Sequence, residues 1–530
     1  MGRGGSILKN TFTVGAFTSL SRVLGLVREM MQSRLIGAGV AQSAFTLAFA
    51  LPNMARKLFG EGALTAAFVP VFRGEVEEVG VAKAARLARA VMTTVFLMLG
   101  ALVSIALAGL ALARCGADAY GFTERTRLTL SLVMVLMPYM LAICGAAFGM
   151  GVLNALGKFT AASLMPALLN IFWIVALGIL CFVPCESVVA RIHFVAFAIL
   201  VGGFAQLAFM FLCMHRAGVS PRPTFKGWGD AKVRLVWRNL GIAAFGAGAV
   251  QVNYMLDQVL AQLAAPWAAG VVGYAERLMD LPLGVIGVAF GTVLLPTFSG
   301  LFAKGDAAGA RDSLVKSVNS LMFVMVPAAV GLAVVARETT SVIYEGGEFD
   351  AVATMRVARA LAVYAAGLGF FGFQKILVPW FQAQKDMKTP LHVSVATVCL
   401  NATLNVLAVW LLPVEWRHVG LAASTVVCAA VGCTMLAVLA RRRNGPLGLA
   451  RCIVPLLRTG FASALMAAAL CAHKSWIYST VESGGSARLS PIPALASLVA
   501  LGCVVYFGAI ALLGGKLRRA RQEGKLRVKS

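Results

Sequence analysis

Long apolar stretches recur along the whole chain, and short polar segments separate each stretch from the next. An α-helix of about 20 apolar residues is long enough to cross the hydrocarbon core of a bilayer. The pattern therefore predicts an all-α polytopic membrane protein with about fourteen transmembrane helices. The predicted spans lie at residues 7–36, 40–66, 87–113, 127–153, 159–183, 189–214, 238–263, 268–298, 315–336, 355–382, 391–413, 418–440, 455–473 and 492–514.

Local sequence patterns recur at a nearly constant distance along the chain. Pro70 and Pro296 lie in similar apolar segments 226 residues apart, and Lys158 and Lys388 begin similar segments 230 residues apart. This distance shifts the pattern by six spans, an even number, so both copies enter the membrane from the same side and form a parallel repeat. We expect two six-helix lobes, residues 1–220 and 221–445, followed by two further helices and a basic tail at 446–530.

The composition excludes a soluble domain and gives the chain an orientation. Of the 530 residues, 59% are hydrophobic and 13% are charged, against about half and a quarter in soluble proteins. With a cytoplasmic N-terminus, most of the 47 Lys and Arg residues lie in cytoplasmic segments, which is the positive-inside pattern. The run Arg441–Arg443 and the tail after Lys516 then face membrane lipids, the C-terminus is cytoplasmic, and we expect no nucleic-acid partner.

Charged and polar side chains are concentrated in four of the spans. A charged side chain at the bilayer centre costs about 2.5–3.5 kcal/mol on insertion scales, so it persists where it faces a partner or a water-filled cavity. The residues are Arg22, Arg28 and Glu29 in the first span, Asn53, Arg56, Lys57 and Glu61 in the second, Asp257 in the seventh, and Glu276, Arg277 and Asp280 in the eighth. They predict a polar cavity inside the membrane.

Arginine is the prevailing cation of this set, and that favours an anionic ligand. The planar guanidinium binds the oxygens of a phosphate or pyrophosphate in a bidentate manner. The alternative is that the charges neutralise one another in buried pairs. The candidate pairs are Arg22 with Glu29, Lys57 with Glu61, and Arg277 with Asp280.

A second polar set has a different chemistry. Asn401 and Asn405 are four residues apart and therefore share one helical face, and Asp257 adds a carboxylate. Oxygen ligands of this kind suit a hard cation. The alternative is that the amides form hydrogen bonds across a helix interface. The chain has no phosphate-binding glycine-rich loop, no nucleophile with an evident base and no Cys/His metal spacing, so we expect a transporter and not an enzyme.

Five segments, in order along the chain, resemble the motifs of one family. They are Ser21–Glu29, Leu51–Ala63, Phe68–Pro70, Tyr274–Pro282 and Gln384–Pro390, and they resemble the MurJ (MviN) lipid II flippases of the multidrug/oligosaccharidyl-lipid/polysaccharide exporter superfamily. The resemblance implies that lipid II, the undecaprenyl-pyrophosphate-linked peptidoglycan precursor, is moved from the inner to the outer leaflet of the bacterial cytoplasmic (inner) membrane by alternating access. It also implies contact with membrane lipids and with cell-wall synthesis proteins.

The resemblance assigns roles to particular residues. Arg22, Arg28, Arg56 and Arg277 would line the substrate cavity, with Glu29, Asn53, Lys57, Glu61 and Asp280 beside them. A sodium site would use Asp257, Asn401, Asn405 and Thr425, and no other cofactor is implied. Two positions depart from the family pattern. The family usually has Asp where this chain has Glu29, and an Asp is common where this chain has Ser43. Rival interpretations are a drug/cation antiporter of the same superfamily and a non-transporting cell-wall scaffold.

Overall fold

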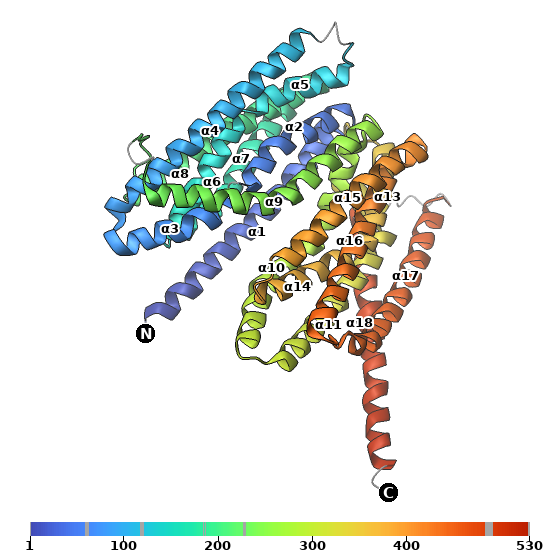
Figure 1. Cartoon of the computed structure of the whole chain (residues 1–530). Coiled ribbons are helices and arrows are strands. Elements are labelled where there is room, and N and C mark those ends of the chain that lie inside the picture. Colours follow the sequence, from blue (N-terminus) through green and yellow to red (C-terminus); the bar gives the residue numbers. More distant parts are fainter. Residues whose placement is uncertain are drawn as a thin grey trace. The chain divides into compact units, whose positions relative to one another are not determined.

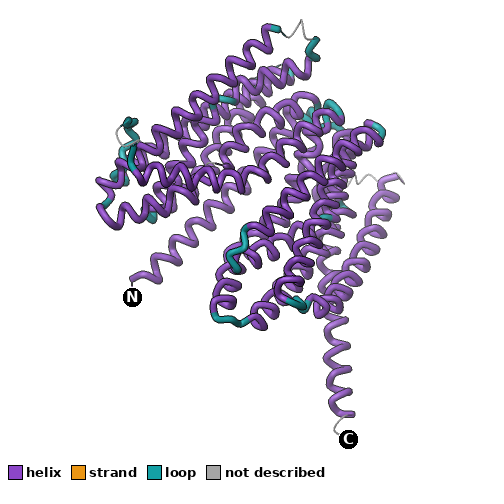
Figure 2. Tube along the Cα trace, in the orientation of Figure 1, coloured by secondary structure: helices purple, strands orange, loops and turns teal. Residues whose placement is uncertain are grey.

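The computed structural model describes residues 2–58, 63–116, 121–183, 185, 187–225, 229–482 and 491–527. Over these ranges the chain is helical, without a strand, and short turns join the helices (Figures 1 and 2). The helices are α1 (Gly2–Ile36), α2 (Val40–Arg56), α3 (Ala63–Val79), α4 (Val81–Cys115), α5 (Glu124–Leu136), α6 (Tyr139–Ala155), α7 (Phe159–Phe182), α8 (Val188–Arg216), α9 (Ala231–Ala264), α10 (Ala268–Ala303), α11 (Ala307–Val334), α12 (Ala336–Tyr344), α13 (Ala351–Ala366), α14 (Leu368–Ala383), α15 (Lys388–Leu411), α16 (Val414–Asn444), η2 (Leu449–Cys452), α17 (Ile453–Glu482) and α18 (Pro491–Arg527). The predicted all-α class is confirmed.

The predicted spans fall on these helices, with two broken spans among them. Span 127–153 covers α5 and α6, which bend by 40°, and span 355–382 covers α13 and α14, which bend by 44°. Pro138 lies in the first break and Gly367 in the second, and both residue types interrupt a helix. Among the described residues, eight helices are long and apolar enough to cross a membrane, or ten if each bent pair is one span. A count of fourteen stays a prediction, because it needs the charge-bearing helices α1, α2, α9 and α10 as well.

Two short helices were not anticipated. The predicted span 40–66 is divided, since α2 ends at Arg56 and α3 begins at Ala63. The nine-residue α12 precedes α13 in the later part of the chain.

The repeat extends over seven pairs of helices and leaves out α17 and α18. Helices α9, α10, α11, α13, α14, α15 and α16 begin 226 to 229 residues after α1, α2, α4, α5, α6, α7 and α8 respectively. Both copies contain the bent pair, and the turn after it has a positive φ in each copy, at Gly157 (73°) and Lys385 (60°). The helix bounds therefore confirm the duplication predicted from the two prolines and the two lysines, and the parallel orientation of the copies in the membrane stays a prediction.

The chain forms two compact units, and the boundary between them differs from the boundary between the two copies of the repeat. One unit contains Met1–Gly270 with Gly346–Asp350, and the other contains Val271–Glu345 with Ala351–Ser530. The boundary predicted between the lobes lies at residue 220 and assigns α9 to the second lobe. In the structure α9 belongs to the first unit, because it packs on α2, α3 and α4. Helices α17 and α18 pack on each other and on α11, within the second unit.

Close helix packing in the first unit depends on small residues. Helix α6 packs on α8, and α1 packs on α7. A Cβ atom added at Gly145 would lie 2.3 Å from the Phe96 ring, and one added at Gly203 would lie 2.3 Å from the Tyr139 ring. Glycine at these positions lets aromatic rings fill the space between helices, as in other membrane bundles.

The segment Gly346–Asp350 is attached to the first unit by backbone and side-chain hydrogen bonds. The Glu348 amide donates to the Arg34 carbonyl (2.9 Å), and the Arg191 Nη1 donates to the Leu35 carbonyl (3.1 Å) and to Glu348 Oε1 (2.9 Å). Gly347 has a φ of 59°, and a Cβ atom there would lie 2.3 Å from the Arg34 carbonyl oxygen. Position 347 therefore needs glycine for both its conformation and its close approach to the end of α1.

Replacing Gly347 by alanine should lower the stability of the first unit. The left-handed conformation of a residue with a side chain costs roughly 1–2 kcal/mol, and the new methyl group must also displace the Arg34 carbonyl. We expect a larger fall in melting temperature in detergent than for Gly80→Ala, since Gly80 has a φ of 78° but an added Cβ meets nothing within 4 Å. Equal falls in the two variants would contradict the role of the close approach.

Candidate functional site

Arg28 is held by contacts from two helices. Its Nη1 donates to Asn170 Oδ1 (2.9 Å), and its guanidinium carbon lies 4.3 Å from the centroid of the Trp173 ring. Its Nη2 forms an ion pair with Glu29, and the two side chains are 17% and 7% exposed. The side chain is therefore oriented before any ligand arrives, by an amide, a carboxylate and a cation–π contact.

Helix α7 supplies both of the distant partners. Asn170 and Trp173 are three residues apart and so share one face of α7, which packs along α1. The Asn170 amide also donates to the Ser21 carbonyl (3.0 Å), and a Cβ at Gly25 would lie 3.8 Å from Asn170 Nδ2. Sequence reasoning noticed Asn170 only as part of the repeat and missed Trp173, although their spacing next to an arginine-bearing span was an available signal.

The end of α2 places two further cations. The Arg56 Nε donates to Asn53 Oδ1 (3.0 Å), one turn earlier on the same helix, and the Lys57 Nζ lies 4.8 Å from the centroid of the Tyr254 ring of α9. Pro52 lies inside α2, and the helix changes to a π-turn at Lys57. The predicted partner of Lys57, Glu61, lies outside the described residues.

An aromatic cluster lies beside Arg28. The Phe49 ring is 5.5 Å from Trp173 and 6.0 Å from Tyr139, measured between centroids. The buried Tyr139 hydroxyl lies within electrostatic range of both Arg56 and Arg28. Arg28 thus lies against one group of rings in the first unit, while Arg22 is exposed on α1.

The charged residues of α10 belong to the second unit. Glu276 and Arg277 are partly buried and Asp280 is exposed. The Tyr364 hydroxyl of α13 donates to Glu276 Oε1 (3.3 Å). On the same stretch of α10, Leu278, Leu281 and Pro282 line an apolar pocket of about 420 Å³, whose other walls come from α11, α12, α17 and α18.

The predicted cation ligands are only partly brought together within a unit. Asn401 and Asn405 are buried on α15, where the Asn405 amide donates to Asn401 Oδ1 (2.9 Å). Thr425 lies on α16, which packs on α15, and its hydroxyl donates to the Leu421 carbonyl (3.2 Å). Asp257 lies on α9 in the first unit, where it accepts from the Asn253 amide (3.3 Å). Amide, hydroxyl and carboxylate oxygens suit sodium by ligand type.

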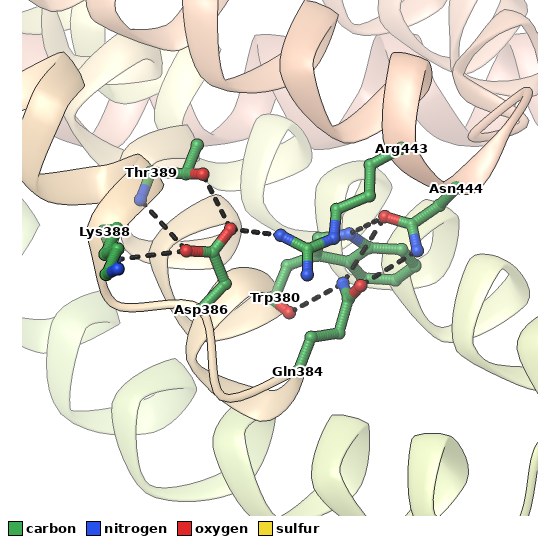
Figure 3. A network of polar contacts seen from close by, with 7 residues as sticks. All are labelled: Trp380, Gln384, Asp386, Lys388, Thr389, Arg443 and Asn444. Carbon is green, nitrogen blue, oxygen red and sulfur yellow. Dashed lines mark hydrogen bonds and ion pairs between the residues drawn. The ribbon is translucent and has the colours of Figure 1, made fainter.

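The motif Gln384–Pro390 forms the turn between α14 and α15 (Figure 3). Asp386 accepts from the Lys388 and Thr389 amides (3.1 and 3.0 Å) and from the Thr389 hydroxyl (2.6 Å), and it forms an ion pair with Arg443 of α16. These contacts, that of the Thr389 hydroxyl first, hold the pKa of the Asp386 carboxyl below its usual range. The motif therefore joins three helices and is not among the cations of α1 and α2.

The departure at position 43 has a structural role that needs no charge. Ser43 is fully buried on α2, and its hydroxyl accepts a hydrogen bond from the amide of Gly270 (3.0 Å). That amide lies in the first turn of α10, where backbone donors have no partner within their own helix. A serine hydroxyl satisfies this donor without burying a carboxylate.

Comparison with known proteins places the chain in a family. The family model described as "Lipid II flippase MurJ" matches residues 32–484. The chain is 32% identical over 516 residues to a probable lipid II flippase MurJ of Rhizobium tropici, covering 96% of this chain and 95% of that protein. It is 30% identical over 526 residues to a probable lipid II flippase MurJ of Vibrio cholerae, covering 97% of each.

Solved structures share the fold. A lipid II flippase MurJ in an inward closed conformation matches with a TM-score of 0.74 at 21% identity, over 95% of this chain and 99% of that one. An inward-facing multidrug transporter of the MOP superfamily matches with a TM-score of 0.65 at 14% identity, over 82% of this chain and 98% of that one. With its arginine-bearing helices, its duplicated fold and these matches, the chain is a member of the MurJ family of membrane proteins.

Proposed function

We propose that this protein is a lipid II flippase, which moves the undecaprenyl-pyrophosphate-linked peptidoglycan precursor from the inner to the outer leaflet of the cytoplasmic membrane. The observation that carries the proposal is the unused donor of Arg28. Its Nε–H is buried and has no acceptor among the described residues. Leaving such a donor unsatisfied costs about 1–3 kcal/mol, and more for a charged group, so an anionic oxygen is the fitting ligand.

The pyrophosphate would bind at the cations of the first unit. Glu29 and Asn170 occupy two of the donors of Arg28, and its Nε–H, which has no acceptor among the described residues, would donate to a phosphate oxygen. Arg22 and Arg56, with Lys57, would neutralise the remaining charge of the headgroup. Asn53 holds the guanidinium of Arg56 in place. Because guanidinium groups bind phosphate oxygens as a fork, this set suits a diphosphate better than the organic cations of a drug antiporter.

The second unit would contribute Arg277 and a place for the polyprenyl tail. Arg277 lies on α10 next to Leu278 and Leu281, which line the apolar pocket of about 420 Å³. An isoprenoid chain gains free energy from burial against such walls, at about 25 cal/mol per Å² relative to water. One helix would thus present a cation to the headgroup and an apolar wall to the lipid.

Transport by alternating access requires two states that expose the bound headgroup to opposite sides of the membrane in turn. Relative motion of the units would expose the arginines first to the cytoplasm and then to the opposite side, with both termini in the cytoplasm. A sodium ion bound by Asp257, Asn401, Asn405 and Thr425 would stabilise one of the two states and so couple transport to the ion gradient. Lipid II in the outer leaflet would be the substrate of cell-wall synthesis proteins, and we propose these proteins as partners.

A bacterial strain depleted of its own flippase should fail to grow when it is supplied with the Arg28→Ala or the Arg277→Ala variant of this protein. Each change removes charge-assisted hydrogen bonds worth about 1.5–3 kcal/mol, so lipid II accessible on the outer face should fall by roughly tenfold or more. Arg73→Ala is the control, because Arg73 is exposed in a surface pair with Glu77. Normal growth with either variant, at equal membrane levels, would contradict the assignment of that arginine.

Lysine at Arg28 separates charge from geometry. Lysine keeps the positive charge but lacks the Nε donor and the planar fork that stacks on Trp173. We expect Arg28→Lys to retain the fold, measured as detergent melting temperature, and to lose most of the lipid II transport. Full transport by this variant would mean that a point charge is sufficient and that the Nε–H has no part in binding.

Sodium should stabilise the purified protein, and the proposed ligands should be needed for it. We expect sodium chloride to raise the melting temperature relative to an equal concentration of potassium chloride. This difference should disappear in Asp257→Asn and in Asn401→Ala, because each removes an oxygen ligand or its charge. A sodium effect that persists in both variants would place the ion elsewhere.

A further inference from the structure

A second pocket lies in the second unit, away from the residues assigned to the headgroup and the polyprenyl tail. It has a volume of about 490 Å³ and is lined by α14, α16 and the turn that leads into η2. Its walls are mainly apolar, with Phe370, Phe373 and Val438 among them, and Arg441 is its charged lining residue. The pocket therefore pairs an apolar interior with one cation.

The charged group of this pocket is the Arg441 guanidinium. Arg441 makes no hydrogen bond or ion pair within the described residues. Two other arginines of this region differ, since Arg443 is paired with Asp386 (Figure 3) and Arg451 is paired with Asp312. The charges of Arg443 and Arg451 are therefore neutralised within the protein, whereas the charge of Arg441 is available to a ligand in the pocket.

The pocket continues along α16 as a shallow groove. A neighbouring pocket of about 370 Å³ is lined by Ala430, Val431 and Met435, and it shares Thr434 and Val438 with the first. From Ala430 to Arg441 a helix rises about 16 Å. That is close to half of the roughly 30 Å hydrocarbon core, which is the depth of one leaflet.

The position of Arg441 matches the edge of the membrane. The apolar run of α16 ends at Ala440, and Arg441, Arg442 and Arg443 follow it directly. An arginine at the end of an apolar helix lies at the level of the lipid headgroups. A groove one leaflet deep with a cation at its headgroup end has the shape and charge of a phospholipid.

We propose that this groove binds one anionic phospholipid, with its phosphate at Arg441 and an acyl chain along α16 over Thr434 and Val438. The occupant is a diacyl glycerophospholipid of net negative charge, such as phosphatidylglycerol. A zwitterionic lipid offers the same chains, but its ammonium group opposes the arginine. The site is independent of the proposed transport function, because none of its residues belongs to the headgroup site or to the tail pocket.

Native mass spectrometry of the full-length protein in detergent, titrated with phosphatidylglycerol or phosphatidylcholine, tests the proposal. Arg441→Gln should weaken binding of phosphatidylglycerol at the first bound equivalent by tenfold or more and leave binding of phosphatidylcholine within twofold. The matched control is Arg442→Gln. This change also removes one positive charge, but the Arg442 side chain does not line the pocket. It should change binding of either lipid by less than twofold.

A second variant tests the groove without changing charge. Ala437→Trp places a large ring in the pocket, and it should reduce binding of phosphatidylglycerol by a similar factor while Arg441 is retained. Unchanged phosphatidylglycerol binding in Arg441→Gln overturns the proposal, as does an equal loss in Arg441→Gln and Arg442→Gln, which would indicate a diffuse charge effect. Displacement of the bound phospholipid by added lipid II would also overturn it, since the groove would then be a substrate site.

Discussion

The interaction on which the rest of the first unit depends is the accommodation of the Arg28 guanidinium among apolar helices. A charged group in such surroundings must have its hydrogen bonds and its counter-charge supplied by the protein or by a ligand. Here Glu29 supplies the charge, Asn170 an acceptor and Trp173 a π-face. The close packing of α1 on α7 and the bond from Asn170 to Ser21 serve the same requirement.

A partial counter-charge is the appropriate arrangement for a transporter. Full neutralisation would remove the attraction for an anion, and no neutralisation would make the empty site too costly to bury. Glu29 pairs with one edge of the guanidinium, and the buried Nε–H has no acceptor among the described residues. At the site proposed above, a diphosphate would bind without reorganisation of these side chains, and its release would leave a state that remains stable.

The duplication gives the two units similar helices with different tasks. Helices α7 and α15 correspond, and each contains buried asparagine. In α7, Asn170 orients an arginine, whereas in α15 Asn401 bonds to Asn405. The same backbone therefore carries the proposed anion site in one unit and proposed oxygen ligands for a cation in the other, because the side chains that contact each asparagine differ. The asymmetry extends to α9, which packs within the first unit although it begins the second copy.

The helical class, most of the helix positions and the repeat were predictable from the sequence, because hydropathy and helical length are local properties of the chain. The division of the span 40–66 and the short helix α12 were not. The sequence also identified Arg28, Arg56 and Arg277 as unusual, since a charge in an apolar stretch is visible without a structure. The fold was needed to show that Glu29 pairs with Arg28, that the Trp173 ring lies against the Arg28 guanidinium, and that Gln384–Pro390 forms a turn. The partner of a buried charge can come from a helix 142 residues away, as Asn170 does, and no local pattern specifies that contact.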